Sequence, residues 1–154
     1  MSIDVGDTIP KFKVSADGGE TVASTDLKGQ KTVLYFYPKD DTSGCTLEAQ
    51  NFRDAAKAFA KAKTRVIGVS KDSVASHDKF KAKYDLNFPL FSDDAGKICE
   101  AFGVWVKKSM YGREYMGIER ATFLIDAKGV VRHVWHKVKV PGHVDEVLAA
   151  AQAL

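Results

Sequence analysis

The sequence predicts an α/β fold in which helices flank a central mixed β-sheet. Two runs rich in β-branched and aromatic residues, Lys31–Pro38 and Thr64–Ser70, lack polar alternation and are typical of buried strands. Between them, Phe52, Ala56 and Phe59 follow one another at helical spacing. A connection of this length carries a helix back across the sheet, so we expect parallel strands joined by a right-handed crossover.

The residues before the first buried strand predict an N-terminal β-hairpin. Phe12–Val14 and Thr21–Ala23 have strand character, and Gly18 and Gly19 lie between them as turn residues. This hairpin precedes the strand-helix-strand unit in the chain.

The segment after the second buried strand predicts two helices around a short strand. Ser73 is a suitable cap for a helix that ends near Tyr84, and Asn87–Ser92 is a short extended segment. Asp93–Gly96 then opens a short helix, which Gly103 closes at the position after its C-cap.

The last third of the chain predicts a loop, a second hairpin and a terminal helix. We expect Lys107–Met116 to be a loop. Ala121–Asp126 and Val130–Lys137 should form antiparallel strands around the turn Ala127–Gly129, and Gly142–Leu154 should form a helix that packs on the sheet. This order of elements is a thioredoxin-like plan with extra pieces, and such a fold does not by itself give a function.

Length, charge and cysteine content exclude several classes of protein. The 154 residues predict one domain that spans 1–154, and a net charge of +3 without runs of like charge gives no reason to expect a nucleic-acid partner. The apolar stretches are far shorter than the ~18 residues of a membrane span, and the first residues lack the features of a signal peptide. We therefore expect a cytoplasmic protein without a membrane partner. Cys45 and Cys99 are too few for a disulfide framework or a four-thiolate zinc site, and we expect neither metal nor cofactor.

The turn Pro38–Cys45 is the first place to look for a site, because ligands of open α/β sheets bind beyond the carboxyl ends of the strands. Thr42 and Ser43 are candidate caps of the next helix, which places Cys45 in its first turn. Unpaired amides and the helix dipole favour an anion there. They can lower a cysteine pKa from ~8.5 to ~3.5–7.5 and so favour the nucleophilic thiolate. This context predicts a nucleophilic Cys45, although a free cysteine is more often a small buried hydrophobe.

The spacing Pro38-x-x-x-Thr42-x-x-Cys45 after a Tyr-Phe-Tyr strand resembles the active-site signature of the peroxiredoxins. The wider segment Tyr35–Ala49 is similar to their PrxQ subfamily, also called bacterioferritin comigratory protein, within the AhpC/TSA group of the thioredoxin-like superfamily. The resemblance extends over nearly the whole chain and includes Val5–Phe12, Gly68–Ser73, Phe88–Asp93, Phe102–Trp105 and Arg120–Asp126.

The resemblance implies a peroxidase that reduces hydrogen peroxide and alkyl hydroperoxides. It assigns the peroxidatic thiol to Cys45, a hydroxyl that holds the peroxide to Thr42, the shield of the site to Pro38 and the activating guanidinium to Arg120. Glu48, one helical turn after Cys45, matches the family pattern and could orient the arginine. These residue types suit the chemistry, since attack of sulfur on an O–O bond moves negative charge along the S–O–O axis and needs donors there.

The resemblance also implies two usual positions for a resolving cysteine, and this chain has Gln50 at one and Lys81 at the other. Cys99 remains, either as an unusual resolving thiol or as a structural one, and we expect it to be structural. The prediction is a one-cysteine mechanism, in which thioredoxin, glutaredoxin or glutathione attacks the sulfenic acid of Cys45.

Other cysteine enzymes fit the sequence less well. A Cys-x-x-Cys reductase would have a thiol where Thr42 stands. A cysteine hydrolase needs a histidine base, and isolated histidines are more often surface or core residues. Metal binding by the close pair His133 and His136 is disfavoured, because their spacing points them to opposite faces of a strand. The four histidines are His77, His133, His136 and His143.

A non-enzymatic alternative is a peroxide-sensing or chaperone-like redox protein in which Cys45 is the oxidised switch. Peroxide consumption over many turnovers would distinguish the enzyme from this sensor. The expected loop, with Trp105, Met110, Tyr111 and Tyr115, could offer apolar contacts to lipid hydroperoxides, although such residues more often pack the loop. We expect a monomer, with a dimer left open.

Overall fold

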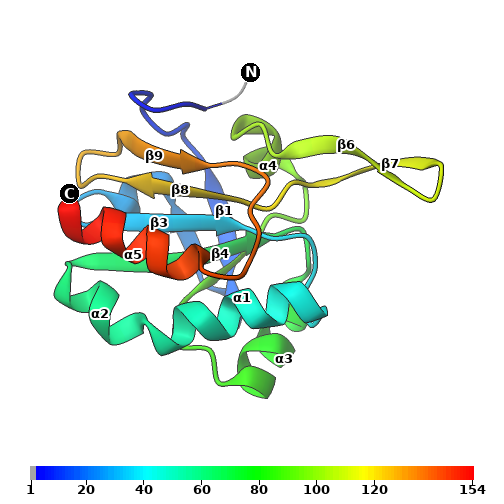
Figure 1. Ribbon diagram of the computed structural model, residues 1–154, viewed down its shortest axis with the longest axis horizontal. Helices are drawn as coiled ribbons and strands as arrows, with labels where there is room; N and C mark the ends of the chain where they lie inside the picture. The colour runs from blue at the N-terminus through cyan, green and yellow to red at the C-terminus, as the bar shows by residue number, and fades with distance from the viewer. Residues whose placement is uncertain (1–2) are drawn as a thin grey trace.

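A computed structural model describes residues 3–154 of the chain. Its main element is a seven-stranded sheet in the order β2-β1-β5-β4-β3-β8-β9, with helices on both faces (Figure 1). The strands are β1 Lys13–Ala16, β2 Thr21–Ala23, β3 Lys31–Phe36, β4 Thr64–Ser70, β5 Leu90–Ser92, β6 Trp105–Met110, β7 Arg113–Ile118, β8 Ala121–Ile125 and β9 Val131–Trp135. The helices are α1 Ser43–Asp54, α2 Ala56–Lys61, α3 Val74–Tyr84, α4 Lys97–Ala101 and α5 His143–Ala153, with 3₁₀ turns η1 Asp17–Gly19 and η2 Ser24–Leu27.

The sheet is mixed, as the sequence predicts. Strands β3 and β4 are parallel, with Lys31 opposite Thr64, and β4 is parallel to β5. Strand β8 runs antiparallel to β3 and to β9, and the N-terminal strands β1 and β2 form the predicted antiparallel pair. The α/β fold, its mixed sheet and its N-terminal hairpin are therefore confirmed.

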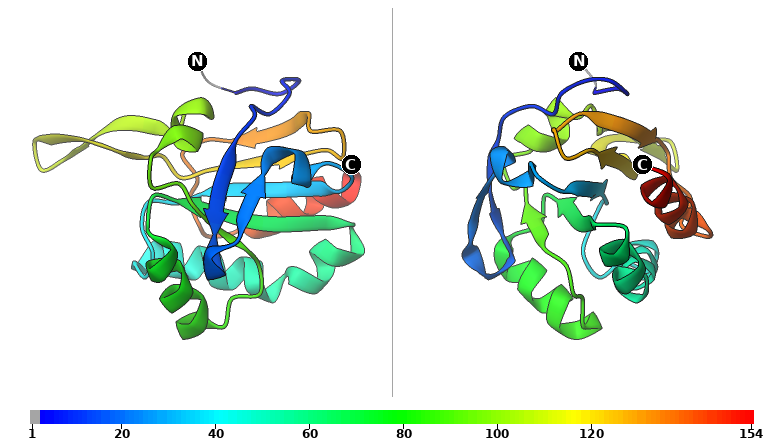
Figure 2. Two further views of the ribbon diagram at one scale, coloured as in Figure 1. Left: turned by 180° about the vertical axis from the view of Figure 1, so that it is seen from behind. Right: turned by 90° about the vertical axis from the view of Figure 1, so that its left-hand side faces the viewer.

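The central strand β3 sends alternate side chains into two separate hydrophobic clusters. Val33 and Tyr35 belong to the cluster that packs under α1, α2, α3 and α5. Leu34 and Phe36 belong to the cluster on the other face, under α4 and the N-terminal segment. Two further views place α1, α2 and α5 on one side of the sheet (Figure 2). Because side chains alternate along a strand, these clusters lie on opposite faces of the sheet.

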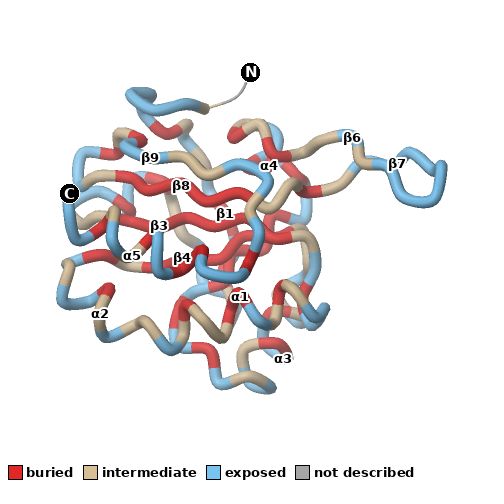
Figure 3. Tube along the Cα trace, viewed as in Figure 1, coloured by how far each residue is buried: buried red, intermediate tan, exposed pale blue. Residues whose placement is uncertain are grey.

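The loop expected at Lys107–Met116 is wrong, because this segment lies in the hairpin β6–β7. Lys107 pairs with Met116 and Met110 with Arg113, so only Tyr111 and Gly112 form the turn. The hairpin projects from the body and is largely exposed (Figure 3). It has no buried face to produce an alternating pattern, and its turn holds a tyrosine at φ 53° where Asn-Gly is the usual signal.

Two helix boundaries also differ from expectation. The helical stretch after Cys45 is divided at Ala55 into α1 and α2. The short helix α4 begins at Lys97 instead of Asp93, and the Asp93 carboxylate accepts hydrogen bonds from the amides of Ile98 and Cys99. Among the helices of residues 3–154, none combines the length and apolar character that crossing a bilayer requires.

Candidate active site

Cys45 lies in the first turn of α1, directly after the turn that follows β3. The helix begins at Ser43, and the amide of Thr46 donates to the carbonyl oxygen of Thr42. The amides of the first turn have no partner inside the helix, so they are available to an anion. Only 2% of Cys45 is exposed to solvent. The predicted placement of this thiol at a helix N-terminus is therefore confirmed.

Arg120 joins this thiol to a buried carboxylate. Its Nη2 donates to the sulfur of Cys45 at 3.4 Å, and its Nη1 donates to Oε1 of Glu48 at 2.7 Å. Ala121, the next residue, pairs with Phe36 at the end of β3, which brings the arginine beside the turn. The structure thus brings together three of the residues that the sequence singled out.

Glycine at position 44 leaves room for the close approach of the arginine. A Cβ atom at Gly44 would lie 3.2 Å from Nη2 of Arg120, which is tighter than an ordinary contact. A larger residue would push the guanidinium away from Cys45. The sequence alone did not show this requirement.

Glu48 is enclosed completely, and this changes its acidity. Its side chain has no exposed surface, and burial raises its pKa to about 7 although Arg120 acts to lower it. Its second oxygen, Oε2, has no hydrogen-bond partner, and neither has the buried hydroxyl of Tyr35. The carboxylate therefore has one firm bond, to Arg120, which fixes one side of the guanidinium.

Thr42 and Pro38 lie at the two ends of the short turn before α1. Thr42 occupies the N-cap position, but its side chain does not cap the helix; its hydroxyl donates to the carbonyl oxygen of Lys39 at 2.9 Å. The expected side-chain cap is therefore wrong, because this threonine closes the turn behind it instead. Its exposed hydroxyl and the half-buried ring of Pro38 border the segment that leads to Cys45.

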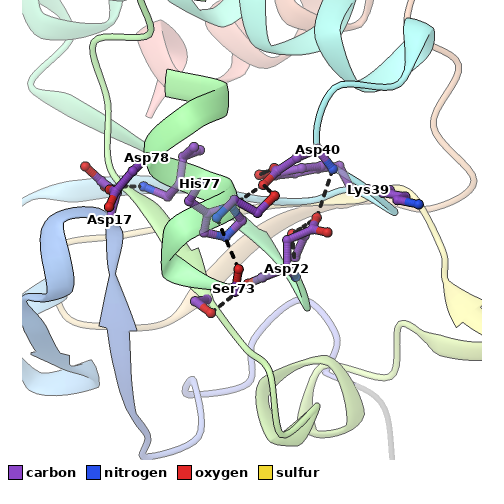
Figure 4. Close-up of polar contacts among 12 residues, drawn as sticks. Asp17, Lys39, Asp40, Asp72, Ser73, His77 and Asp78 are labelled. Carbon is purple, nitrogen blue, oxygen red and sulfur yellow. Dashed lines mark hydrogen bonds and ion pairs between the residues drawn. The ribbon is translucent and has the colours of Figure 1, made fainter. Parts of the chain in front are cut away.

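A buried network holds this turn from the inside, and sequence reasoning missed it (Figure 4). The Asp40 carboxylate accepts hydrogen bonds from Tyr37, Ser76 and His77, and its amide donates to Asp72. His77 was expected to be an ordinary core or surface histidine, and it does lie in the core. Asp40 and His77 are far apart in sequence, so no local pattern could pair them.

The second thiol, Cys99, lies in a different environment. It has no exposed surface and packs in the cluster under α4, whereas Cys45 packs in the cluster under α1. Burial raises the pKa of Cys99 well above its ordinary value, and the neighbouring Asp93 raises it further. These are the properties of an unreactive core thiol.

The remaining histidines are engaged away from Cys45. His136 contacts Glu119, the Nε2 of His143 lies 2.8 Å from the hydroxyl of Thr122, and His133 stacks on Trp135. These contacts do not form the cysteine–histidine pair of a hydrolase.

The geometry permits one type of chemistry particularly well. A buried sulfur sits where helix amides and a guanidinium both favour negative charge, and the hydroxyl of Thr42 lies on the turn before it. When the sulfur attacks a small molecule with two adjacent oxygens, the negative charge that develops lies beside these donors.

Comparison with known proteins points the same way. The model of the AhpC/TSA family matches residues 5–134. A putative peroxiredoxin bcp of Coxiella burnetii is 55% identical over 148 residues, covering 96% of this chain and 98% of that protein. Peroxiredoxin Bcp of Bacillus subtilis is 52% identical over 148 residues, covering 96% and 94%.

Solved structures agree with these relatives. Bacterioferritin comigratory protein of Xanthomonas campestris superposes with a TM-score of 0.90 at 44% identity, over 96% of this chain and 98% of that one. PrxQ of Xylella fastidiosa gives a TM-score of 0.94 at 40% identity, over 99% and 98%.

Proposed function

The chain belongs to the AhpC/TSA family as a peroxiredoxin of the Bcp or PrxQ type, a thiol-dependent peroxidase, and from this premise we propose how its residues divide the reaction. The observation that carries the proposal is the guanidinium of Arg120, which contacts both the sulfur of Cys45 and the carboxylate of Glu48. We assign the peroxidatic thiol to Cys45. The whole chain, 1–154, acts as one domain in this proposal.

The first step is an attack of the Cys45 thiolate on one oxygen of the hydroperoxide. An S–O bond forms and the O–O bond breaks, so sulfur loses two electrons and the peroxide gains them. The leaving oxygen departs as water or an alcohol after it takes up a proton, and Cys45 becomes a sulfenic acid. Negative charge moves from sulfur toward the leaving oxygen during this step, and donors held in place stabilise it.

Arg120 is placed to stabilise that charge, and Glu48 holds it there. The bidentate geometry of a guanidinium lets one nitrogen bond Glu48 while the other faces Cys45. The hydroxyl of Thr42 is proposed to hold the peroxide: it donates its proton to Lys39, which leaves its lone pairs free to accept a hydrogen bond from the peroxide O–H. Pro38 restricts water on the side of the turn where it lies and adds no amide donor.

A one-cysteine cycle is supported by the position of Cys99. Cys45 and Cys99 pack in clusters on opposite faces of the sheet, so a disulfide between them would require α1 or α4 to leave its cluster. In the proposed cycle an external thiol attacks the sulfenic acid, releases water and leaves a mixed disulfide. A second thiol then reduces that disulfide and regenerates Cys45.

Several features of the partners follow from this cycle. The thiol reductant is thioredoxin, glutaredoxin or glutathione, and the substrates are hydrogen peroxide and alkyl hydroperoxides. A relative from Xanthomonas campestris is described by its alkyl peroxide reduction activity, which supports the second substrate class. We propose a monomer that works in the cytoplasm, where thiol reductants are kept reduced.

The test combines turnover with mass spectrometry. The protein is supplied with hydrogen peroxide and, in separate assays, with thioredoxin and its reductase, with glutaredoxin, or with glutathione. We expect many turnovers with at least one system, and a single sulfenic acid on Cys45 when no thiol is present. One stoichiometric oxidation with every reductant would indicate the sensor instead. A Cys45–Cys99 disulfide in peroxide-treated protein, together with loss of turnover in Cys99→Ser, would contradict the one-cysteine cycle.

A further inference from the structure

His77 is bound on both sides to atoms that only accept hydrogen bonds. Its Nδ1 lies 2.7 Å from Oδ2 of Asp40, and its Nε2 lies 2.9 Å from the carbonyl oxygen of Phe91. The His77 side chain has no exposed surface and that of Asp40 exposes 3%. A carbonyl oxygen and an ionised carboxylate have no proton to give, so each ring nitrogen must carry one. The contacts therefore fit a charged imidazolium paired with an ionised Asp40.

The groups around the pair support both charges. The hydroxyl of Tyr37 donates to Oδ1 of Asp40 at 2.6 Å, and the hydroxyl of Ser76 donates to Oδ2 at 2.8 Å. Burial alone would lower the pKa of His77, but the hydrogen bond and charge of Asp40, with the charge of Asp72, raise it above its ordinary value. These contacts favour the imidazolium form of His77 over the neutral ring.

Other charged groups on α3 are engaged away from the imidazole. Asp78 accepts a hydrogen bond from the amide of Gly18, and Lys81 forms an ion pair with Asp17 at 2.8 Å. Figure 4 shows Asp17 and Asp78 on the side of His77 away from Asp40. The charges that face the imidazole are consequently those of two carboxylates, one from the active-site turn and one from the segment after β4.

A cation site is the other reading of this cluster, and its hydrogen bonds argue against it. Asp40, Asp72 and His77 each offer an atom, and these atoms lie within 4.8 Å of one another. A metal would need an unprotonated ring nitrogen and free carboxylate oxygens. Here both ring nitrogens are used, and Oδ2 of Asp72 already accepts from the Asp40 amide and from the hydroxyl of Ser70. The cluster is a closed hydrogen-bond network.

This network holds the turn that carries two proposed site residues. Asp40 lies midway between Pro38 and Thr42, and its side chain and amide tie the turn to α3 and to the end of β4. A second tie runs along the surface, where Lys83 of α3 forms an ion pair with Asp41 at 2.8 Å. The inner tie is buried and charged, whereas the outer one is exposed to solvent and therefore weak.

We propose that His77 and Asp40 are a positioning pair for the peroxide reaction. Their buried ion pair fixes the turn on which Pro38 and Thr42 meet the peroxide, without contact to the reacting sulfur. The inference rests on the proposed roles of Pro38 and Thr42. Its consequence is specific: loss of the pair slows the approach of peroxide to Cys45, but leaves the thiolate able to react with reagents that need no such pocket.

The test compares two reactions of the same sulfur in His77→Phe and His77→Asn. We expect His77→Phe to slow oxidation of Cys45 by hydrogen peroxide roughly 10- to 100-fold, the range in which small misplacements act. His77→Asn keeps one donor toward Asp40 and should fall between it and the wild type. Alkylation of Cys45 by iodoacetamide should stay within about threefold of wild type, since it depends on the thiolate and not on the turn that holds the peroxide.

The matched control is Lys83→Met, which breaks the exposed tie to the same turn. Both of its rates should stay within about twofold of wild type. A loss of peroxide reactivity in the His77 variants that only matches their unfolded fraction would reduce the pair to a stabilising contact and overturn the proposal. A folded His77→Phe with the wild-type peroxide rate would overturn it as well. Failure of the proposed function looks different, because wild-type protein would then consume no peroxide.

A measurement on the wild-type protein covers the case of variants that fail to fold. Nitrogen chemical shifts should show both ring nitrogens of His77 protonated at pH 7. Amide exchange at Lys39–Thr42 should accelerate when that ring loses its proton at higher pH. The acceleration should exceed the general increase of exchange with hydroxide concentration, for which the amide of Lys83 serves as the reference. A neutral ring at pH 7, or a turn that does not respond to its deprotonation, would contradict the positioning pair.

Discussion

The two cysteines of this chain are both buried in hydrophobic clusters and both lie near a carboxylate, yet their surroundings are opposite in charge. At Cys45, a guanidinium stands between the sulfur and Glu48, and the first-turn amides of α1 lie beside it. At Cys99, Asp93 is the neighbour and raises the thiol pKa together with burial. The nearest charge is positive at Cys45 and negative at Cys99.

The comparison teaches that burial alone does not decide whether a thiol reacts. Cys45 is 2% exposed and Cys99 is 0% exposed, a difference too small to separate a nucleophile from a core residue. What differs is the sign of the nearest charge and the position along a helix. A free cysteine in a hydrophobic core should therefore be judged by its nearest ionised partner.

The largest effect is expected from exchanging serine for each thiol in turn. Cys45→Ser should lower the peroxidase rate by roughly three orders of magnitude or more, because a hydroxyl is a poor nucleophile without a base. Cys99→Ser should retain turnover. The measurement is hydrogen peroxide consumption with a regenerating thiol system. Turnover by Cys45→Ser would refute the assignment of the peroxidatic thiol.

Arg120→Ala removes the positive charge beside Cys45 and is expected to make this thiol less reactive, as we expect Cys99 to be. Loss of a donor that stabilises charge in a transition state costs about 10²- to 10³-fold, so the rate of Cys45 oxidation should fall by that factor. Stopped-flow oxidation by hydrogen peroxide measures it. Arg132→Ala, which removes an exposed guanidinium paired with Asp126, is the matched control and should change the rate by less than about twofold.

The sequence alone predicts the parts of this contrast that depend on neighbouring residues. It does not predict the parts that depend on contacts between residues far apart in the chain. The position of Cys45 in the first turn of a helix follows from local signals, namely a buried strand, a polar turn and then helical spacing. The bond from Arg120 to Cys45 joins residues far apart in the chain, and it was expected only because the segment resembles a known family. The Asp40–His77 pair had neither a local pattern nor a recognised motif, and it was missed.

The errors have a similar cause. The hairpin β6–β7 was predicted as a loop because it projects into solvent, where no buried face imposes alternation on Lys107–Met116. Thr42 was expected to cap α1, but its hydroxyl could bond in either direction, and it bonds back to Lys39. In both places the sequence permits two local structures, and tertiary contacts or solvent decide between them.

Glu48→Gln tests the contrast between the two cysteines by removing the carboxylate that binds Arg120 beside Cys45. Burial raises the pKa of Glu48 from its ordinary value of 4.5 to about 7, so the folded protein binds this proton more tightly than the unfolded chain. The contribution of Glu48 to the free energy of unfolding therefore decreases as pH rises from about 4.5 through 7. Glutamine does not titrate, so the wild type alone loses this contribution. The free energy of unfolding of Glu48→Gln, relative to that of wild type, should therefore rise by at most about 3 kcal/mol from pH 5 to pH 8.

The same variant should be less active than wild type, although its relative stability rises with pH. A neutral amide holds the guanidinium less firmly than a carboxylate, so we expect roughly tenfold slower oxidation of Cys45 at pH 8. Urea titrations at the two pH values and stopped-flow kinetics provide the two readings. A variant that is less stable than wild type at pH 8 by the same amount as at pH 5 would show that Glu48 does not titrate in this range.

The smallest effect on activity is expected at Cys99. Its replacement by alanine tests whether this thiol takes no part in the reaction. Cys99→Ala should leave turnover within about twofold and lower the free energy of unfolding by about 1–2 kcal/mol, because it removes a buried sulfur from a packed cluster. In the native wild-type protein, iodoacetamide at pH 8 should modify Cys45 and leave Cys99 unmodified until urea unfolds the chain, since the pKa of Cys99 is raised and its surface is covered. Peptide mapping of the alkylated protein reports both sites at once. Rapid alkylation of Cys99 before unfolding would mean that α4 leaves its cluster readily enough for this thiol to reach solvent, and the argument that separates it from Cys45 would no longer stand.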